Sequence, residues 1–178
     1  MRTRSDSTQP AGRKRAEPAA ATGPKAPRVQ DIMTSDVEDC NPTTDLASAA
    51  MVMWRRDCGF LPVVDTVTKG VVGAITDRDI CMAVATKGRR ASEIQVSEVI
   101  SGKAYTCAPS DPIRKALDVM RANRVRRLPV VDAQGALTGV LSLNDVVLHA
   151  RTQGRETGPE REELLRTYEA ICEHLQPA

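Results

Sequence analysis

The sequence predicts an α+β protein that contains two copies of one β-α-β-β-α unit. The first observation behind this prediction is the pentapeptide LPVVD, which occurs at Leu61–Asp65 and again at Leu128–Asp132. The second is that the register persists on both sides of it, and a sustained internal match indicates a duplicated supersecondary unit. Identical pairs separated by 67 or 66 positions are Val29 and Val96, Cys40 and Cys107, Pro42 and Pro109, Met53 and Met120, Gly73 and Gly139, and Asp79 and Asp145.

Each copy opens with a short leading segment and a brief strand. The leading segments are VQDIMTSD, from Val29, and VSEVISGK, from Val96, and the brief strands lie near Cys40 and Cys107. The stretches NPTTD and APSDP then offer Thr, Ser and Asp side chains as helix caps. A helix follows in each copy, because apolar residues recur on one helical face. These are Leu46, Ala50 and Met53, then Ile113, Leu117 and Met120.

Two β-branched runs and a second helix complete each copy. We expect strands at Phe60–Val64 and Val71–Ile75, and at Leu128–Val131 and Leu137–Leu141. The intervening turns, DTVTKG and DAQGA, carry the Gly and Asp residues typical of hairpin loops. The second helix is expected to start at Thr76 or Ser142.

The two copies are expected to pack sheet against sheet. A single copy of this size exposes too much surface for a stable core, and pairing buries both apolar faces. The chain has only four aromatic residues, so the core should be aliphatic. We expect the first unit at residues 29–90 and the second at 91–150, with residues 85–95 as the link.

The two ends of the chain stand outside the repeat. Residues 1–28 carry seven Lys or Arg against two acidic residues and lack apolar periodicity, which predicts a disordered basic tail. Such a tail either solubilises the protein or binds nucleic acid, although it has no aromatic residue for base stacking. Residues 151–178 should form a loop and an amphipathic helix that docks on its own domain, on a dimer mate or on a partner. Its apolar stripe is Leu164, Leu165, Tyr168, Ile171, Cys172 and Leu175.

Several functional classes find little support. The five cysteines form no C-x-x-C pair, which argues against a disulfide framework or a metal site and favours a reducing compartment. We read Cys40 and Cys107 as paired core residues. With no membrane-spanning run and no signal core, we expect a cytoplasmic protein without membrane contact. The histidines, His149 and His174, belong to no catalytic arrangement and there is no phosphate loop, so we expect neither enzyme activity nor a catalytic cofactor.

The chemical signal lies in GAITDRD (Gly73–Asp79) and GVLSLND (Gly139–Asp145). Each glycine permits another backbone to approach closely, or an unusual φ. Each Thr or Ser sits where a strand becomes a helix, and the Asp three residues later completes a capping box. The same groups can hold a nucleoside, because helix N–H groups attract anions and a carboxylate accepts hydrogen bonds from ribose hydroxyls.

These motifs, in order with DIMT, VSEVIS and VRRLPVVD, resemble a tandem pair of CBS domains, the Bateman module, over about residues 29–150. The resemblance implies two βαββα units packed through their sheets with pseudo-two-fold symmetry. It implies two clefts for adenosine-containing ligands such as AMP, ADP, ATP or S-adenosylmethionine, and frequent assembly into a disc-shaped dimer.

The resemblance also implies roles for particular residues. Ribose contacts fall on Asp79, Asp145, Thr76 and Ser142, and base contacts on Thr34, Val37, Ser101 and Ala104. Phosphate contacts fall on Arg126 and Arg127, because Arg pairs well with phosphate oxygens. The first copy has Gly59 and Phe60 at the equivalent positions, so we expect unequal clefts, only one with a strong arginine contribution. Alternatively, these arginines form a solvated edge.

The function most consistent with these features is a regulatory ligand sensor that acts through a homodimer or through an unidentified protein partner. A ligand shifts such a module only by its differential affinity for two states. The alternative is a scaffold or nucleic-acid-associated protein that uses residues 1–28 and has vestigial clefts.

Overall fold

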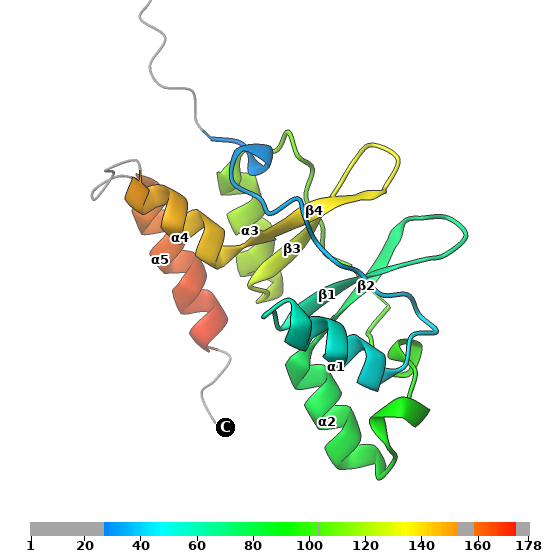
Figure 1. Ribbon diagram of the computed structural model, residues 1–178. Coiled ribbons are helices and arrows are strands. Elements are labelled where there is room, and N and C mark those ends of the chain that lie inside the picture. Colours follow the sequence, from blue (N-terminus) through cyan, green and yellow to red (C-terminus); the bar gives the residue numbers. More distant parts are fainter. Residues whose placement is uncertain (1–26, 103, 153–158, 174–178) are drawn as a thin grey trace, which may run out of the picture.

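Both copies of the repeat form the same elements in the same order in the computed structural model, which describes residues 27–102, 104–152 and 159–173 (Figure 1). The predicted tail therefore lies almost entirely outside the described residues. The first copy contains α1 (Leu46–Arg55), β1 (Phe60–Val64), β2 (Val71–Thr76) and α2 (Asp77–Lys87). The second contains α3 (Ile113–Asn123), β3 (Arg127–Val131), β4 (Leu137–Ser142) and α4 (Leu143–Thr152), followed by α5 (Pro159–Cys172). The α+β fold of two βαββα units is confirmed.

Each unit is built on an antiparallel hairpin. Strand β1 pairs with β2 and β3 with β4, and both pairs shift register at the same step, after Val63 and after Val130. The brief third strand is a single parallel bridge in each unit, from Cys40 to Val63 and from Cys107 to Val130. Both thiols are 5% exposed, and burial raises the pKa of each to about 12. The prediction that these cysteines belong to the core is confirmed.

The leading segment of each copy packs on the other unit. Val29 is fully buried in the core around β3 and β4, whereas Val96 is fully buried in the core around β1 and β2. Short 3-10 turns hold these residues at Val29–Asp31 and Val96–Glu98. Residues 85–95 are consequently more than a link, because Ile94 is also fully buried in the first core. The repeat in sequence and the packing in space therefore divide the chain differently in these segments.

Close approach of the leading segments explains the motif glycines. A Cβ on Gly139 would lie 2.5 Å from the carbonyl oxygen of Thr34, and a Cβ on Gly73 would lie 3.0 Å from Cδ1 of Ile100. Neither glycine has a positive φ. Of the two roles predicted for these glycines, close approach is the one found.

Equivalent residues meet where the two units touch. Gly70 forms a bridge with Ala136, and the Arg127 guanidinium lies 6.0 Å from the centre of the Phe60 ring. Both pairs occupy matching positions of the repeat, which is what a pseudo-two-fold relation requires. The helices lie at opposite ends, with α1 and α2 at one end and α3, α4 and α5 at the other (Figure 1).

The C-terminal helix docks on its own chain, across α3 and α4. Thr167 and Ile171 are buried and Leu164 is partly buried against the second core. Of the predicted stripe, Leu164, Ile171 and Cys172 are buried or half-buried, whereas Leu165 and Tyr168 are 53% and 52% exposed, so the prediction was wrong for these two residues. Leu175 lies outside the described residues.

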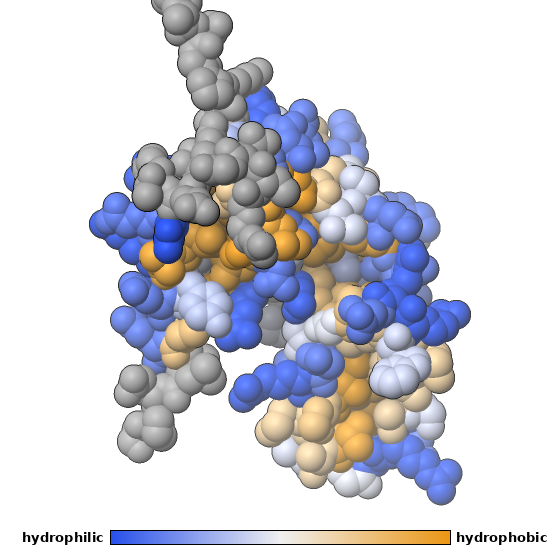
Figure 2. All heavy atoms as spheres, turned by 60° about the vertical axis from the view of Figure 1, so that its left-hand side comes forward, coloured by the Kyte–Doolittle hydropathy of each residue, from blue (hydrophilic) through white to orange (hydrophobic). Residues whose placement is uncertain are grey.

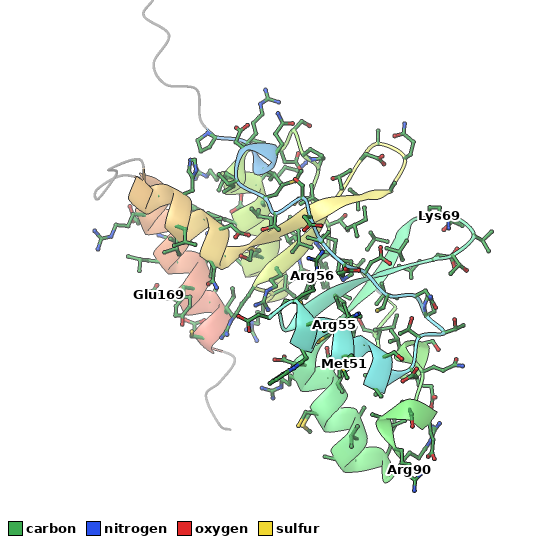
Figure 3. All side chains as sticks on the ribbon, in the orientation of Figure 1. Met51, Arg55, Arg56, Lys69, Arg90 and Glu169 are labelled. Carbon is green, nitrogen blue, oxygen red and sulfur yellow. The ribbon has the colours of Figure 1, made fainter. Side chains whose placement is uncertain are left out.

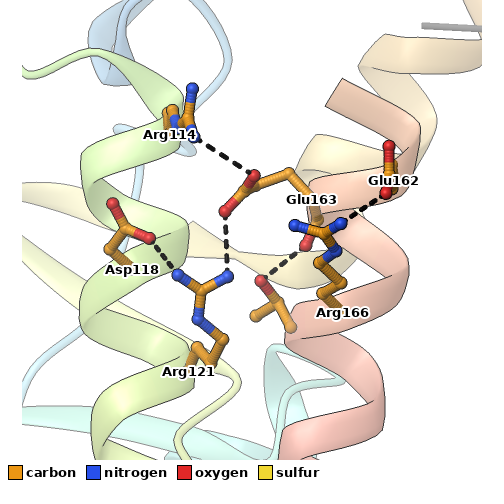
Figure 4. Close-up of polar contacts among 7 residues, drawn as sticks. Arg114, Asp118, Arg121, Glu162, Glu163 and Arg166 are labelled. Atoms are coloured by element: carbon orange, nitrogen blue, oxygen red, sulfur yellow. Dashed lines mark hydrogen bonds and ion pairs between the residues drawn. The ribbon is translucent and has the colours of Figure 1, made fainter. Parts of the chain in front are cut away.

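Glu163 fixes the phase of α5. Its carboxylate pairs with Arg121 at 2.9 Å and with Arg114 at 3.8 Å, both on α3 (Figure 4). Arg121 in turn pairs with Asp118, so a network of charges spans the contact (Figure 4). Across the described parts of the chain, no helix is long and apolar enough to cross a membrane.

Candidate functional site

The two T/S-x-x-D motifs form the capping boxes that the sequence predicts. The Thr76 Oγ1 accepts a hydrogen bond from the Asp79 N–H at 3.2 Å, and Asp79 Oδ2 accepts from the Thr76 N–H at 2.9 Å and from its hydroxyl at 2.6 Å. Ser142 and Asp145 repeat this arrangement at 3.1, 2.8 and 2.7 Å. These bonds start α2 and α4 at matching points.

The capping bonds leave part of each carboxylate available. All of them use Oδ2, and Oδ1 of Asp79 and of Asp145 accepts no hydrogen bond from the described residues. Both aspartates are partly exposed. A carboxylate oxygen held rigidly at a helix N-terminus can accept hydrogen bonds from a ligand hydroxyl without reorganising. The cap therefore positions a polar group that faces outward.

A cleft of about 460 Å³ lies at the Ser142 end, and we call it the first cleft. It has the size of a small-molecule site. Five of the residues predicted for ligand binding line it together: Thr34, Val37, Arg127, Ser142 and Asp145. Thr34 comes from the leading segment of the first copy and reaches β4 by exchanging two backbone hydrogen bonds with Val140. The first cleft is therefore built from both copies.

The other predicted residues lie elsewhere. Thr76, Asp79, Ser101 and Ala104 mark the equivalent region of the molecule, which we call the second cleft. Ser101 and Ala74 would match Thr34 and Val140, but these two described residues form no backbone hydrogen bond with each other. The two regions thus differ in how the leading segment is fixed.

The predicted arginine pair is split by the structure. Arg127 lines the first cleft, whereas the Arg126 carbonyl accepts the Leu143 N–H at 2.9 Å. Neither Arg126 nor Gly59, its equivalent in the first copy, is among the residues that line the first cleft. Strand β3 begins at Arg127, so Arg126 lies just before the strand.

The first cleft also contains charged residues that the sequence analysis did not select. Arg56 bridges Asp36 at 3.1 Å and Glu38 at 3.3 Å, and Asp57 lies beside it. Arg56 sits at the end of α1, where the chain turns into β1 (Figure 3). Comparing the two copies position by position would have drawn attention to Asp57, because the second copy has Arg124 there.

A groove of about 400 Å³ runs between α1 and α2 and shares Asp57 and Cys58 with the first cleft. Met53, Trp54 and Ile80 line it, and Trp54 is 84% exposed. Figure 2 shows apolar side chains on the lower lobe of the molecule, which α1 and α2 form. In the second unit the matching residues Met120 and Val146 share a core with Ile171 of α5.

No group of three or more His, Cys, Asp or Glu side chains in the described ranges is placed to hold a metal ion. Chemically, the first cleft thus offers hydrogen-bond acceptors, two guanidinium groups and an apolar wall. It offers no arrangement of nucleophile and base in the part of the chain that the structure describes.

Comparison with known proteins agrees with this architecture. The CBS domain pattern matches residues 29–86 and 96–151. CBS domain-containing protein YhcV of Bacillus subtilis is 34% identical over 122 residues, covering 68% of this chain and 84% of that protein. Inosine-5'-monophosphate dehydrogenase of Methanocaldococcus jannaschii is 33% identical over 121 residues, which make up 67% of this chain but 23% of that enzyme. The crystal structure of CBSX2 in complex with AMP has a TM-score of 0.60 and 26% identity, covering 72% of this chain and 98% of that one.

Proposed function

The chain belongs to the CBS domain family, and we propose that it is a regulatory module that binds an adenosine-containing ligand and acts through a homodimer or a protein partner. The supporting observation is the first cleft, in which Thr34, Val37, Ser142 and Asp145 line one cavity. The similarity of the chain to CBSX2, which was crystallised with AMP, supports an adenosine nucleotide as the ligand. The ligands considered are AMP, ADP, ATP and S-adenosylmethionine.

The proposed contacts follow from the geometry of the caps. Oδ1 of Asp145 accepts hydrogen bonds from the ribose hydroxyls, and the base lies toward Thr34 and Val37. Asp79 and Thr76 play the same part in the second cleft, with Ser101 and Ala104 toward the base. The guanidinium group of Arg127 contributes to ligand phosphate binding, with Arg126 just before it in the chain.

We propose a regulatory rather than a catalytic role. The similarity to YhcV runs along most of that protein, which its name describes only by its CBS domains. The similarity to inosine-5'-monophosphate dehydrogenase is confined to 23% of that enzyme, so the enzyme's activity does not carry over.

A binding experiment tests the ligand proposal. Isothermal titration calorimetry with AMP, ATP and S-adenosylmethionine should give a dissociation constant below 1 mM for at least one of them. Asp145→Asn and Asp79→Asn keep a capping side chain but lose the charge, so each should weaken binding in its own cleft by about tenfold or more. Full affinity in both variants would refute the ribose assignment, and no binding of any ligand at millimolar concentration would refute the proposed function.

The homodimer is proposed to form through the α1–α2 face. Met51, Trp54 and Met82 are 56%, 84% and 51% exposed there, and Met51 lies on the outer side of α1 (Figure 3). The matching face of the second unit is covered by α5. On α3, the ion-paired residues Arg121 and Asp118 lie at the positions of Trp54 and Met51 on α1. The α1–α2 face therefore lacks the charges that hold α5 on the second unit.

A second copy is the occupant that this face fits. In a two-fold dimer the same patch meets itself, so an apolar patch meets an apolar patch. Light scattering should give a dimer for the wild type. Trp54→Arg, which introduces the residue found at the matching position of α3, should give a monomer that stays folded, with an unchanged circular-dichroism spectrum. Leu165→Arg on α5 is the control and should remain dimeric. A monomeric wild type, or a Leu165→Arg variant that dissociates while Trp54→Arg does not, would refute this interface.

A further inference from the structure

Asp57 and Arg124 occupy matching positions with the same unusual backbone conformation and opposite charge. Their φ angles are 48° and 53°, in the left-handed region; Asp57 lies two residues after the end of α1 and Arg124 one residue after the end of α3. The following residues close the helix ends alike, since the Cys58 N–H donates to the Met53 carbonyl and the Val125 N–H to the Met120 carbonyl, both at 3.0 Å. The local folds are therefore equivalent, and the side chains differ only in chemistry.

The charges around the first cleft are predominantly negative. Four carboxylates line it, against two guanidinium groups, a formal balance of −2. The carboxylates belong to Asp36, Glu38, Asp57 and Asp145, and the guanidinium groups to Arg56 and Arg127. Arg56 is already engaged by Asp36 and Glu38, so it offers little to a phosphate.

The repeat reverses these charges around the second cleft. Asp57 corresponds to Arg124, Asn144 to Arg78 and Asp145 to Asp79. Glu38 corresponds to Tyr105, and Arg56 to Asn123. The acidic residue and the arginine that pairs with it in the first cleft therefore have uncharged equivalents in the second. Arg127 lies 6.0 Å from the ring of Phe60, its own equivalent, where the units touch. By the repeat, we therefore expect Arg78, Arg124 and Arg127 against Asp79 around the second cleft, a formal balance of +2 at the described positions.

We propose that the two clefts select ligands of opposite charge, and that Asp57 and Arg124 are the residues that set the selection. The first cleft takes a nucleoside with a neutral or cationic group at its 5' end, such as a thioether or sulfonium compound. The second takes a nucleotide with a di- or triphosphate. This proposal rests on the proposed nucleoside binding and deepens it.

The physical reason is the interaction of fixed charges with the 5' group. A partly enclosed cleft has a lower effective dielectric than water, so a single charge reversal near the ligand changes affinity by about tenfold. Repulsion from several carboxylates acts against a triphosphate and favours a cation. Both clefts keep the Thr/Ser–Asp pair, so both keep the proposed ribose contacts.

Selective loss of each cleft tests the division. The probes are 5'-methylthioadenosine, which is neutral, and ATP, in calorimetric titrations of the full chain. Methylthioadenosine binding should weaken by tenfold or more in Asp145→Asn and stay unchanged in Asp79→Asn. ATP binding should show the reverse. If ATP binds more tightly than methylthioadenosine in Asp79→Asn, which keeps the first cleft intact, the charge proposal is wrong while the proposed function stands.

Exchange of the selecting residues gives a sharper test. Asp57→Arg in the Asp79→Asn background should raise ATP affinity at the first cleft by about tenfold and leave methylthioadenosine affinity unchanged. The backbone accepts arginine there, because Arg124 adopts the same φ. Arg124→Asp in the Asp145→Asn background should lower ATP affinity by a similar factor.

Glu169→Arg provides the matched control, since it changes the net charge as Asp57→Arg does. Glu169 is exposed on α5 and does not line the first cleft (Figure 3). It should leave both affinities unchanged. Equal effects of Glu169→Arg and Asp57→Arg would attribute the change to overall charge and overturn the assignment of Asp57. If neither probe binds the wild type at millimolar concentration, the proposed function itself fails, and this inference fails with it.

Discussion

The two units have the same interior and different surfaces. Strands β1 and β3 share one burial pattern, with Leu-Pro-Val buried between two partly exposed residues. On the outside, Trp54 on α1 is 84% exposed, while Arg121 at the matching position of α3 is ion-paired with Glu163 of α5. The repeat therefore fixes what packs, and the differences fall on residues that face solvent, a ligand or another helix.

The difference teaches where to look for function in a duplicated protein. The two copies carry similar core residues, so a charge reversal at an exposed position, such as Asp57 to Arg124, has no packing cause. The same holds for Met51 and Asp118 on the outer helix faces. The first unit presents an open apolar groove between its helices, whereas α5 covers the matching face of the second unit.

The largest expected effect distinguishes the two leading segments. Gly139→Ala would bring its Cβ within 2.5 Å of the Thr34 backbone oxygen, and backbone cannot move aside as a side chain does. We expect a loss of about 2–3 kcal/mol in the free energy of unfolding, measured by urea denaturation. Gly73→Ala meets only the end of the Ile100 side chain, at 3.0 Å, and should cost less than about 1 kcal/mol. Equal losses would show that the two segments are held alike.

A smaller effect is expected at the helix that covers only one unit. The Glu163 side chain is 12% exposed and pairs with two arginines of α3, so Glu163→Gln should destabilise the protein by about 1–2 kcal/mol. The neighbouring Glu162 is 67% exposed and pairs with Arg166, one turn along α5 (Figure 4). Glu162→Gln should change stability by less than about 0.5 kcal/mol. Thermal unfolding measures both, and equal shifts would remove Glu163 as the anchor of α5.

The repeat made the elements of the fold easy to predict. It gave two independent views of each strand, so the strand bounds differ from the observed ones by one residue at most. The capping boxes at Thr76 and Ser142 were predicted for the same reason. Strands and capping boxes are determined by residues that are close in the sequence, so the sequence alone is enough to predict them.

Relations in space were not predictable in the same way. An apolar residue such as Val29 must be buried, but periodicity does not say in which core, so the crossing of the leading segments was not foreseen. The phase of α5 depends on Glu163, whose charge counts as solvent-facing in any hydropathy pattern. Asp36, Glu38 and Arg56 were passed over because their importance comes from lining one cleft together.

The smallest effect is a dependence of stability on pH, at the turn before α1 and α3, which the two units close with different side chains. Before α1, Thr44 Oγ1 accepts the Asn41 N–H at 3.1 Å, and before α3, Asp111 Oδ2 accepts the Ala108 N–H at 2.9 Å. Partial burial alone would raise the pKa of Asp111, but hydrogen bonds from Lys115 and from Ala108 hold it below 3.8. Because the folded pKa lies below the unfolded one, the carboxylate stabilises the fold above about pH 4, and this contribution fades as pH falls through the folded pKa.

Asp111→Thr copies the first unit at this position and removes the titrating group. We expect it to lower stability by about 1 kcal/mol at pH 7, because an ionised hydrogen-bond partner is lost. The gap between wild type and variant should narrow as pH falls below about 4 and through the lowered folded pKa, as urea denaturation at each pH would measure. Thr44→Val in the first unit removes the matching hydrogen bond without a charge, so its effect should be independent of pH over that range. A gap for Asp111→Thr that stays constant with pH would mean that Asp111 acts through shape, as Thr44 does.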